Sequence, residues 1–354
     1  MLSKICKITL LFFLVFFLKN PAYTKSFEEK NVYNYFSALV SVENNDNIES
    51  LNYFNLSKEL KESHESYIKK YLFSLVLSGK INKAINEIKT TNKKNFTDFF
   101  EAHLLLAVDN IKKKNYNKSL EHLRELQRYK GDGTFKLIIS NFLAEYLYLF
   151  KYEKIKPEED KNFGKLSLIN KTLQSCYLGS ANTGNFFENL VNYEEEGNSR
   201  YLFFYANYLI TQNNILKAKE IFKDVNSINS TLLIAQSKEW LTMERYEDFK
   251  SIFSCENSND IIAELFFIIS NLYSAEDEIE KSNFYFNLSN FLNPKFKFNS
   301  ALQARNFFER EGMKLDKTRD ATVEFARRIL KSSHIANKKR SLEKAREIAA
   351  NLDY

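Results

Sequence analysis

The chain has very few of the residues that interrupt regular structure. It holds 8 glycines and 3 prolines among 354 residues. Sandwiches and barrels depend on many tight turns, which glycine and proline largely supply, so this scarcity argues against an all-β fold. Long helices joined by short polar turns fit the composition better.

Cysteine is also scarce, and its three positions do not form a disulfide framework. Cys6 precedes the first apolar run, so it cannot be the lipid-attachment cysteine of a lipoprotein. Cys176 and Cys255 are far apart in the sequence, and no other cysteine lies between them. Export would permit a disulfide between them, but we expect two isolated cysteines to be small buried side chains with free thiols.

The chain also lacks a large excess of positive or negative charge. The formal net charge is +6, but three of the lysines belong to the segment 1–24, and the segment 309–354 has an excess of basic over acidic side chains. The part of the chain between these segments is therefore close to neutral. Nucleic-acid binders present a broad basic surface, so we expect no nucleic-acid partner.

The N-terminal segment 1–24 has the pattern of a secretory signal peptide. Lys4 and Lys7 precede an apolar run over 8–18, and the small residues Ala22 and Thr24 follow it. A membrane crossing needs about 20 apolar residues, so this run is short for one. We expect cleavage after Thr24 and an exported, periplasmic mature chain. An uncleaved N-terminal membrane anchor is the alternative.

No group of residues points to catalysis or to a bound metal. The four histidines (His64, His103, His122 and His334) have no metal-ligand spacing among themselves or relative to the cysteines. His103 and His122 could face each other within one helix pair. The sequence contains no nucleophile elbow, Walker phosphate loop or dinucleotide-binding turn. We therefore expect neither an enzyme nor a cofactor.

What the chain does contain is a recurring spacing of small and aromatic residues, with a period of about 34 residues. One copy begins with Ser270 and Ser282, continues with Phe286 and Ser289, and ends on Pro294. Residues three and four apart share a helix face, and proline cannot continue a helix. This copy therefore predicts two helices, near 264–275 and 279–291. Such a period indicates stacked helix pairs.

The same spacing recurs in at least four other places. The residues expected to pack within the pairs are Ala38, Ser50, Phe54, Ala84, Ala107, Ser119, Ala206, Ala218, Phe222, Ser270, Tyr273, Ser282, Phe286, Ser289 and Pro294. These units, the last of which ends on Leu292, Asn293 and Pro294, resemble the tetratricopeptide repeats of exported bacterial envelope proteins. The resemblance implies an all-α fold, a right-handed superhelical solenoid of antiparallel helix pairs.

The pattern divides the chain into five parts. Residues 1–24 are the signal peptide, and residues 31–130 and 199–296 hold the clearest repeats. Residues 131–198 are less regular and are either further helix pairs or a hinge. Residues 297–354 are expected to form basic helices that cap the stack. Within them, the segment 327–346 could instead contact an anionic membrane surface.

The resemblance also implies a concave groove that binds another protein or a peptide segment. The positions expected to face it are Tyr35, Phe73, Leu104, Phe203, Asn207, Phe267 and Asn271. Their side chains favour an apolar or aromatic peptide whose backbone hydrogen-bonds with Asn207 and Asn271. Each aromatic residue could equally be ordinary packing between helices.

The function expected from these features is that of an exported, non-catalytic scaffold that helps to assemble or organise envelope proteins. The alternative is an auxiliary helical module of a cell-wall or polysaccharide enzyme system. A partner protein or peptide segment is the only ligand that the first interpretation requires.

Overall fold

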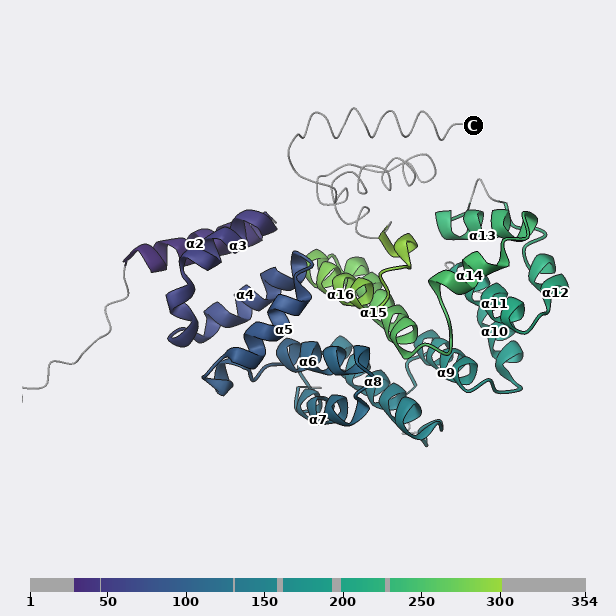
Figure 1. Ribbon diagram of the computed structural model, residues 1–354, viewed down its shortest axis with the longest axis horizontal. Coiled ribbons are helices and arrows are strands. Elements are labelled where there is room, and N and C mark those ends of the chain that lie inside the picture. Colours follow the sequence, from purple (N-terminus) through teal and green to yellow (C-terminus); the bar gives the residue numbers. More distant parts are fainter. Residues whose placement is uncertain are drawn as a thin grey trace, which may run out of the picture. The chain divides into compact units, whose positions relative to one another are not determined.

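The computed structural model describes residues 29–44, 46–129, 131–157, 162–192, 199–226 and 230–300. Over these residues the chain forms 15 α-helices, three short 3₁₀ helices and no strand (Figure 1). The all-α prediction is therefore confirmed. The predicted signal peptide, the segment 327–346 and all but the first four residues of 297–354 lie outside the described residues.

Two compact units follow one another along the chain, and they divide between Tyr67 and Ile68, inside α4 (Glu65–Leu77). The first unit contains α2 (Glu29–Glu43), α3 (Asn47–Leu56) and the 3₁₀ helix η1 (Lys58–Glu62). Helices α2 and α3 pack as a pair. The rings of Tyr35, Phe54 and Tyr67 contact one another in the core of this unit.

The second unit contains the remaining helices, most of them in short pairs. They are α5 (Ile81–Thr90), α6 (Phe100–Lys112), α7 (Tyr116–Gln127), α8 (Thr134–Tyr152), α9 (Lys165–Tyr177), α10 (Thr183–Val191), α11 (Ser199–Thr211), α12 (Ile215–Glu220), α13 (Leu232–Thr242), α14 (Tyr246–Ile252), α15 (Ser258–Ala275) and α16 (Ile279–Leu292), with the 3₁₀ helices η2 (Lys94–Thr97) and η3 (Lys297–Asn299). Contacts join α6 to α7, α9 to α10, α11 to α12, α13 to α14 and α15 to α16. The segment 131–198 supplies the long helix α8 and the pair α9–α10.

One turn geometry recurs between successive helices. In five turns a residue with positive φ lies two positions before the next helix begins: Gly79, Lys114, Asn213, Glu244 and Asp277. The N–H of the following residue donates to the carbonyl five positions earlier, at 2.8–2.9 Å in every case. This is the hydrogen bond of a Schellman motif, which ends a helix and satisfies its last carbonyls. The same local structure is thus built repeatedly from different residues.

All of the residues predicted to pack within the pairs are buried except Pro294, for which the prediction is wrong. Their small members, Ala38, Ser50, Ala84, Ala107, Ser119, Ala206, Ala218, Ser270 and Ser282, have no exposed surface. Two of them lie face to face, because the Ser119 hydroxyl donates to the Ala107 carbonyl oxygen over 3.0 Å. The larger residues Phe54, Phe222, Tyr273 and Phe286 are also buried, as is Ser289. Pro294 is exposed and follows Asn293, the residue at which α16 ends.

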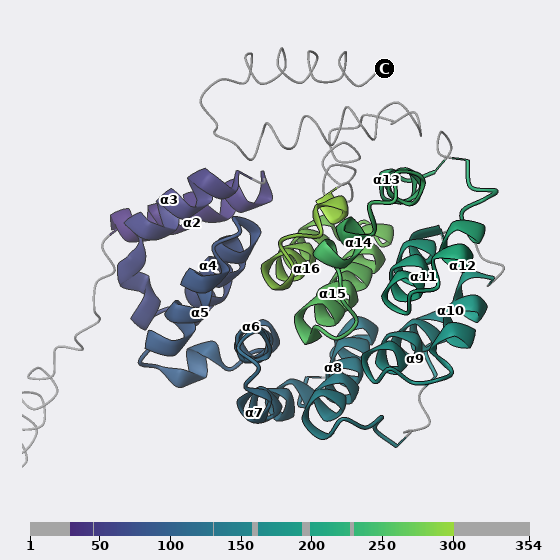
Figure 2. The same ribbon diagram turned by 45° about the vertical axis from the view of Figure 1, so that its right-hand side comes forward.

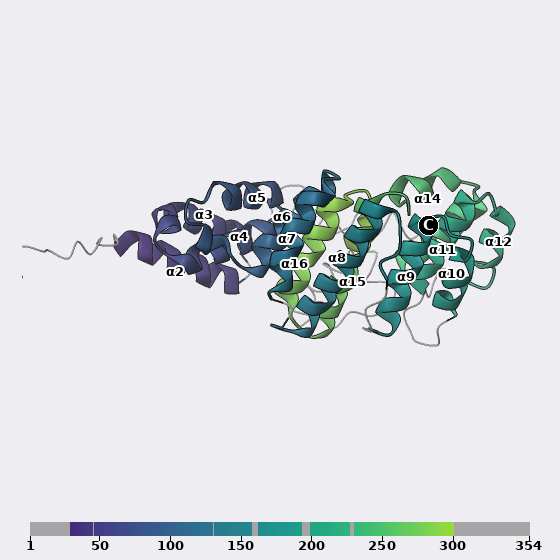
Figure 3. The same cartoon turned by 90° about the horizontal axis from the view of Figure 1, so that it is seen from below.

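Helices α15 and α16 return to segments far earlier in the chain. Helix α15 contacts α6 and α8, and α16 contacts α6 (Figure 2, Figure 3). Lys112 Nζ donates to the Phe291 carbonyl oxygen over 2.7 Å, and Asn287 Nδ2 donates to that of Val76 over 3.0 Å. In an open stack each pair touches only its neighbours. These contacts add a long-range packing that the repeat pattern does not predict.

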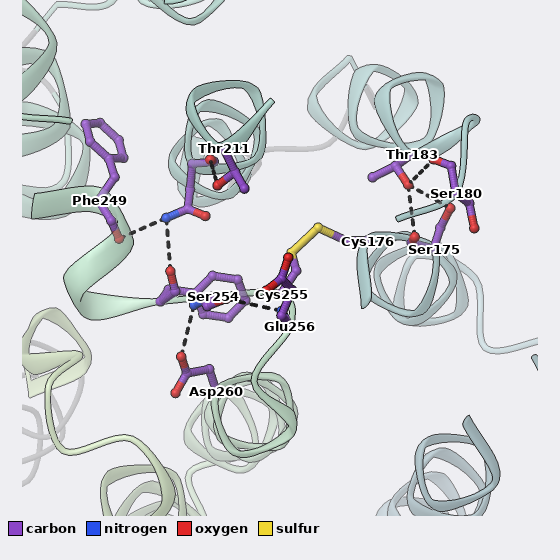
Figure 4. The surroundings of a disulfide bond; sticks show 12 residues. Ser175, Cys176, Ser180, Thr183, Thr211, Phe249, Ser254, Cys255, Glu256 and Asp260 are labelled. Atoms are coloured by element: carbon purple, nitrogen blue, oxygen red, sulfur yellow. Dashed lines mark hydrogen bonds between the residues drawn. A yellow bond between two sulfur atoms is a disulfide. The ribbon is translucent and has the colours of Figure 1, made fainter. Parts of the chain in front are cut away.

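A disulfide joins Cys176 of α9 to Cys255 in the loop between α14 and α15 (Figure 4). The expectation of free thiols is therefore wrong, although both cysteines are buried as expected. Next to Cys255 in the sequence, the Ser254 N–H donates a hydrogen bond to Asp260 Oδ2 over 2.9 Å (Figure 4). Sequence spacing could not reveal the bond, because tertiary packing alone brings the two segments together.

Candidate functional site

Most side chains predicted to line a concave groove are buried. Tyr35, Leu104, Phe203, Asn207 and Phe267 are at most 8% exposed. They pack among other side chains and are not accessible to a partner in this structure. The packing alternative therefore describes these five positions better than the groove does.

Asn207 illustrates the physical reason. Its Nδ2 donates to the main-chain oxygens of Phe249, over 2.8 Å, and Phe253, over 3.1 Å. One turn earlier, the ring of Phe203 stacks on that of Phe249 with centroids 5.5 Å apart. Helix α14 contacts α11 here. The Asn207 amide thus binds the end of α14 instead of a partner's backbone.

The α15 positions Phe267 and Asn271 are also engaged within the chain. Asn271 is partly exposed, and its Nδ2 donates to the Phe267 carbonyl oxygen one turn earlier over 2.9 Å. The Arg200 guanidinium lies 3.9 Å from the centroid of the Phe267 ring. Arg200 also donates two hydrogen bonds to Glu264, at 2.8 and 2.6 Å. A buried ion pair therefore covers this part of α15.

Phe73 is the predicted groove residue that lies in a cleft. The cleft has a volume of about 600 Å³ and is bounded by α4, α6, the start of α8, and the α15–α16 turn. Its lining residues are Phe73, Glu101, Asp132, Gly133, Thr134, Phe135, Lys136, Tyr273, Glu276, Glu278, Lys281, Phe284 and Tyr285. All of them belong to the second compact unit. This cleft is the candidate functional site.

Aromatic rings form the floor of the cleft. Phe73 stacks on Phe284 with centroids 5.0 Å apart, Phe135 meets Tyr273 edge-on at 4.5 Å, and Tyr273 stacks on Tyr285 at 5.2 Å. Burial raises the pKa of Tyr273 to about 12, so its phenol keeps its proton at neutral pH. Of these rings, Phe73 and Phe135 are partly exposed and can contact a ligand, whereas Tyr273, Phe284 and Tyr285 are buried and pack beneath them. Stacked rings lose little conformational freedom on binding.

Carboxylates dominate the rim. Asp132 pairs with Lys136 at 3.7 Å, and Glu278 pairs with Lys281 at 2.9 Å. Glu101 and Glu276 add two carboxylates, so four acids face two lysines and the cleft is negative by two charges. Oε2 of Glu101 is buried and has no hydrogen-bond partner among the described residues. A buried acceptor without a partner is costly, so Glu101 is the acceptor of the cleft that gains most from a donor.

Sequence reasoning missed most of this cleft. Phe73 was identified as a groove residue and Tyr273 as a packing residue, whereas Glu101, Phe135 and Tyr285 carried no signal. The lining residues come from separate stretches of sequence that meet only because α15 and α16 pack against α6 and α8. The spacing of residues within one stretch carries no information about its contacts with another stretch.

A second cluster lies where α6 and α7 approach each other. The ligand atoms of Asp98, His103 and Glu125 fall within 4.8 Å of one another, a grouping that could hold a metal ion. Arg128 Nη1 already donates to Asp98, over 3.3 Å, and to Glu125, over 2.6 Å. A hydrogen bond from His103 is the main cause that lowers the pKa of Asp98. The guanidinium supplies the positive charge that these carboxylates require, so we do not take this cluster as the functional site.

His103 and His122 do face each other, with ring centroids 6.2 Å apart. Burial, followed by the neighbouring His103, lowers the pKa of His122.

Among the described residues, no helix combines the length and apolar character needed to cross a membrane. Comparison with known proteins gave no match to this chain among family models, curated proteins or solved structures.

Proposed function

We propose that this protein is an exported, non-catalytic helical-repeat scaffold of the tetratricopeptide type, which binds a segment of another protein and helps to assemble or organise envelope proteins. The recurring Schellman turns support the repeat assignment. Their left-handed residues, in the pairs Gly79 and Lys114, Asn213 and Glu244, and Glu244 and Asp277, follow one another at roughly 31 to 35 residues, close to the period of such repeats. In this proposal the repeats form a right-handed solenoid whose last helices fold back on earlier ones.

Export is supported by two independent features. The segment 1–24 has the order of a signal peptide, with basic residues, an apolar run and small residues. The Cys176–Cys255 disulfide would persist in an oxidising compartment and is uncommon in a reducing cytosol. Both features support the proposed periplasmic location.

The observation that carries the binding function is the cleft at the α15–α16 turn. Its volume of about 600 Å³ is that of a ligand pocket, and its floor is aromatic, as in the centres of many protein interfaces. It replaces the predicted concave groove as the place where a partner binds. Phe73 is the position that both interpretations share.

The test is affinity capture from an envelope fraction with the full-length chain and two variants. Phe73→Ala removes a partly exposed ring from the cleft, whereas Phe36→Ala removes a ring that is 59% exposed on α2, outside it. Capture is carried out well below the melting temperature of all three proteins, because loss of the Phe73–Phe284 stack should itself lower stability. We expect Phe73→Ala to lose partners that the wild type and Phe36→Ala retain. Equal capture by all three proteins would overturn the assignment of the cleft.

Affinity capture, together with sedimentation of the purified chain with isolated cell wall, tests the alternative of an auxiliary module for a cell-wall or polysaccharide enzyme system. In that case the partner retained by the wild type would be an enzyme acting on those polymers, and the purified chain would sediment with isolated cell wall only when that enzyme is present. A scaffold for envelope proteins captures its partner in the absence of cell wall.

A further inference from the structure

The lining of the cleft at the α15–α16 turn carries a net negative charge. We propose that it binds a segment carrying an arginine or lysine side chain next to an apolar or aromatic residue. The inference rests on the proposed function, and it specifies the chemistry of the partner. It replaces the uncharged peptide that the sequence pattern favoured.

The acidic side chains of the lining outnumber the basic ones. Both lysines of the cleft are tied to carboxylates of the same cleft, Lys136 to Asp132 and Lys281 to Glu278. The Glu101 and Glu276 carboxylates have no compensating cation among the lining residues. A cationic ligand complements this surface, whereas an anionic one meets repulsion from it.

Glu101 is the carboxylate of the cleft that lacks a hydrogen-bond donor among the described residues for one of its oxygens. It lies in the first turn of α6, and its Oε2 atom is buried without a hydrogen-bond partner in the described part of the chain. Because this oxygen is covered, the Glu101 side chain must rotate into the cleft before a ligand can reach it. A guanidinium or ammonium group there donates several N–H bonds and would satisfy the oxygen in a partly desolvated site, where charge-assisted hydrogen bonds are strong.

Aromatic rings line the same cleft as this carboxylate. The Tyr273 and Tyr285 rings stack at 5.2 Å, and Phe73 and Phe284 form a second stack. Arginine and lysine side chains pack their aliphatic stems and cationic heads against such rings. The cleft already contains one example, since Lys281 Nζ lies 5.6 Å from the centroid of Tyr273. An apolar neighbour of the basic residue would cover the partly exposed rings of Phe73 and Phe135.

The experiment uses the full-length protein and three pools of fluorescent heptapeptides in anisotropy titrations. The pools share flanking positions randomised over Phe, Leu, Tyr, Ser and Gly, and they differ only at the centre, which is arginine, its neutral isostere citrulline, or glutamate. We expect the arginine pool to bind about tenfold more tightly than the citrulline pool, and the glutamate pool to bind most weakly. High salt should reduce this preference.

Two variants assign the preference to the cleft. Glu101→Gln keeps the shape of the side chain and removes its charge, so it should abolish the preference for arginine while leaving the citrulline pool's affinity unchanged. Glu220→Gln, an exposed carboxylate of α12 that does not line the cleft, should retain the preference. A preference that survives Glu101→Gln would overturn the inference.

Other outcomes separate this inference from the proposed function. Equal binding of the arginine and citrulline pools would refute the basic specificity and leave peptide binding in place. Binding of none of the pools would count against both. Tightest binding of the glutamate pool would refute the charge argument.

The chain's own segment 327–346 carries the basic side chains that such a cleft would select, so it is tested as a competitor. A full-length variant tests this by neutralising four basic residues, Arg327, Arg328, Lys338 and Lys339, as glutamine. An unchanged affinity for the arginine pool supports an outside partner. An affinity that rises more than tenfold would mean that this segment fills the cleft, and the assignment to an outside partner would be wrong. A dimer that Glu101→Gln dissociates in sedimentation would likewise transfer the assignment to a second copy.

Discussion

Ser270 of α15 and Ser282 of α16 exchange hydrogen bonds across their helix pair. The Ser270 hydroxyl donates to the Ser282 carbonyl oxygen over 2.7 Å, and the Ser282 hydroxyl donates to that of Ser270 over 2.8 Å. Both residues are completely buried. The helices approach closely enough for these bonds because neither side chain extends beyond a hydroxyl. The regular spacing of small residues in the sequence is thus a direct contact in the structure.

Replacing Ser282 by a larger residue should therefore lower the free energy of unfolding far more than removing its hydroxyl. Ser282→Ala loses one donor and should lower the free energy of unfolding by about 1 kcal/mol. Ser282→Leu overpacks the contact and should lower it by about 3 kcal/mol. Urea denaturation measures both, with the exposed Asn290→Leu of the same helix as the control. Equal effects of Leu at 282 and 290 would contradict the close approach.

Glycine at the left-handed turn positions should stabilise the fold. Lys114 is exposed and has a φ of 57°, a conformation that is strained for a residue with a Cβ atom. Lys114→Gly should raise the free energy of unfolding by about 0.5 to 1 kcal/mol. The converse change, Gly79→Ala at the matching turn, should lower it by about 1 kcal/mol. A loss of stability in Lys114→Gly would refute the strain argument.

Loss of the Cys176–Cys255 disulfide should lower the free energy of unfolding, mainly because the unfolded chain gains conformational entropy. The bond joins residues with a sequence separation of 79, for which chain entropy predicts a loss of about 4 kcal/mol on removal. We expect the double serine variant and the reduced wild type to unfold at similarly lowered urea concentrations. Reductant should not change the variant. Alkylation of both cysteines in the native, unreduced protein, detected by peptide mass spectrometry, would show that the bond is absent.

Asp260 should make stability depend on pH. Burial raises the pKa of its carboxyl from 3.8 to about 6. The folded state therefore binds this proton more tightly than the unfolded state, so its contribution is complete below about pH 4 and is lost as pH rises from about 4 to 6. Asp260→Asn should remove that loss and raise stability at pH 7 by up to about 3 kcal/mol.

Urea denaturation of the wild type and Asp260→Asn at pH 4 and pH 7 measures this effect as a difference between the two proteins. Asp224→Asn, an exposed aspartate, is the matched control and should follow the wild type at both values. A wild type and an Asp260→Asn variant that change in parallel with pH would contradict the raised pKa. The Ser254 N–H should still be satisfied in the variant, because the asparagine carbonyl can accept its hydrogen bond.

Local features were predictable from the sequence because they depend on residues close together in the chain. The pair predicted near 264–275 and 279–291 is α15 (Ser258–Ala275) and α16 (Ile279–Leu292), so the turn and the second helix were placed almost correctly. Helix α15 begins earlier because Asn257 caps it by accepting from the Asn259 N–H. The burial of the regularly spaced small residues followed from the same periodicity.

The residues that would face a partner were predicted less accurately than the helix pairs. The side chains of Phe203 and Asn207 lie on the correct helix, but α14 covers their face. A helix with apolar residues on more than one side does not reveal which side meets solvent, since every such side can be covered by another helix.

The sequence by itself determined that the described part of this protein is helical and that regularly spaced small residues are buried between neighbouring helices. Those properties arise from the 3.6-residue period of a helix and from turn geometry, which act over a few residues. Only the tertiary structure decided that Cys176 meets Cys255, that α15 and α16 pack on α6 and α8, and that an acidic, aromatic cleft forms at their turn. These contacts depend on which apolar faces of distant segments fit together, and hydrophobic burial is non-directional, so no local pattern encodes the choice.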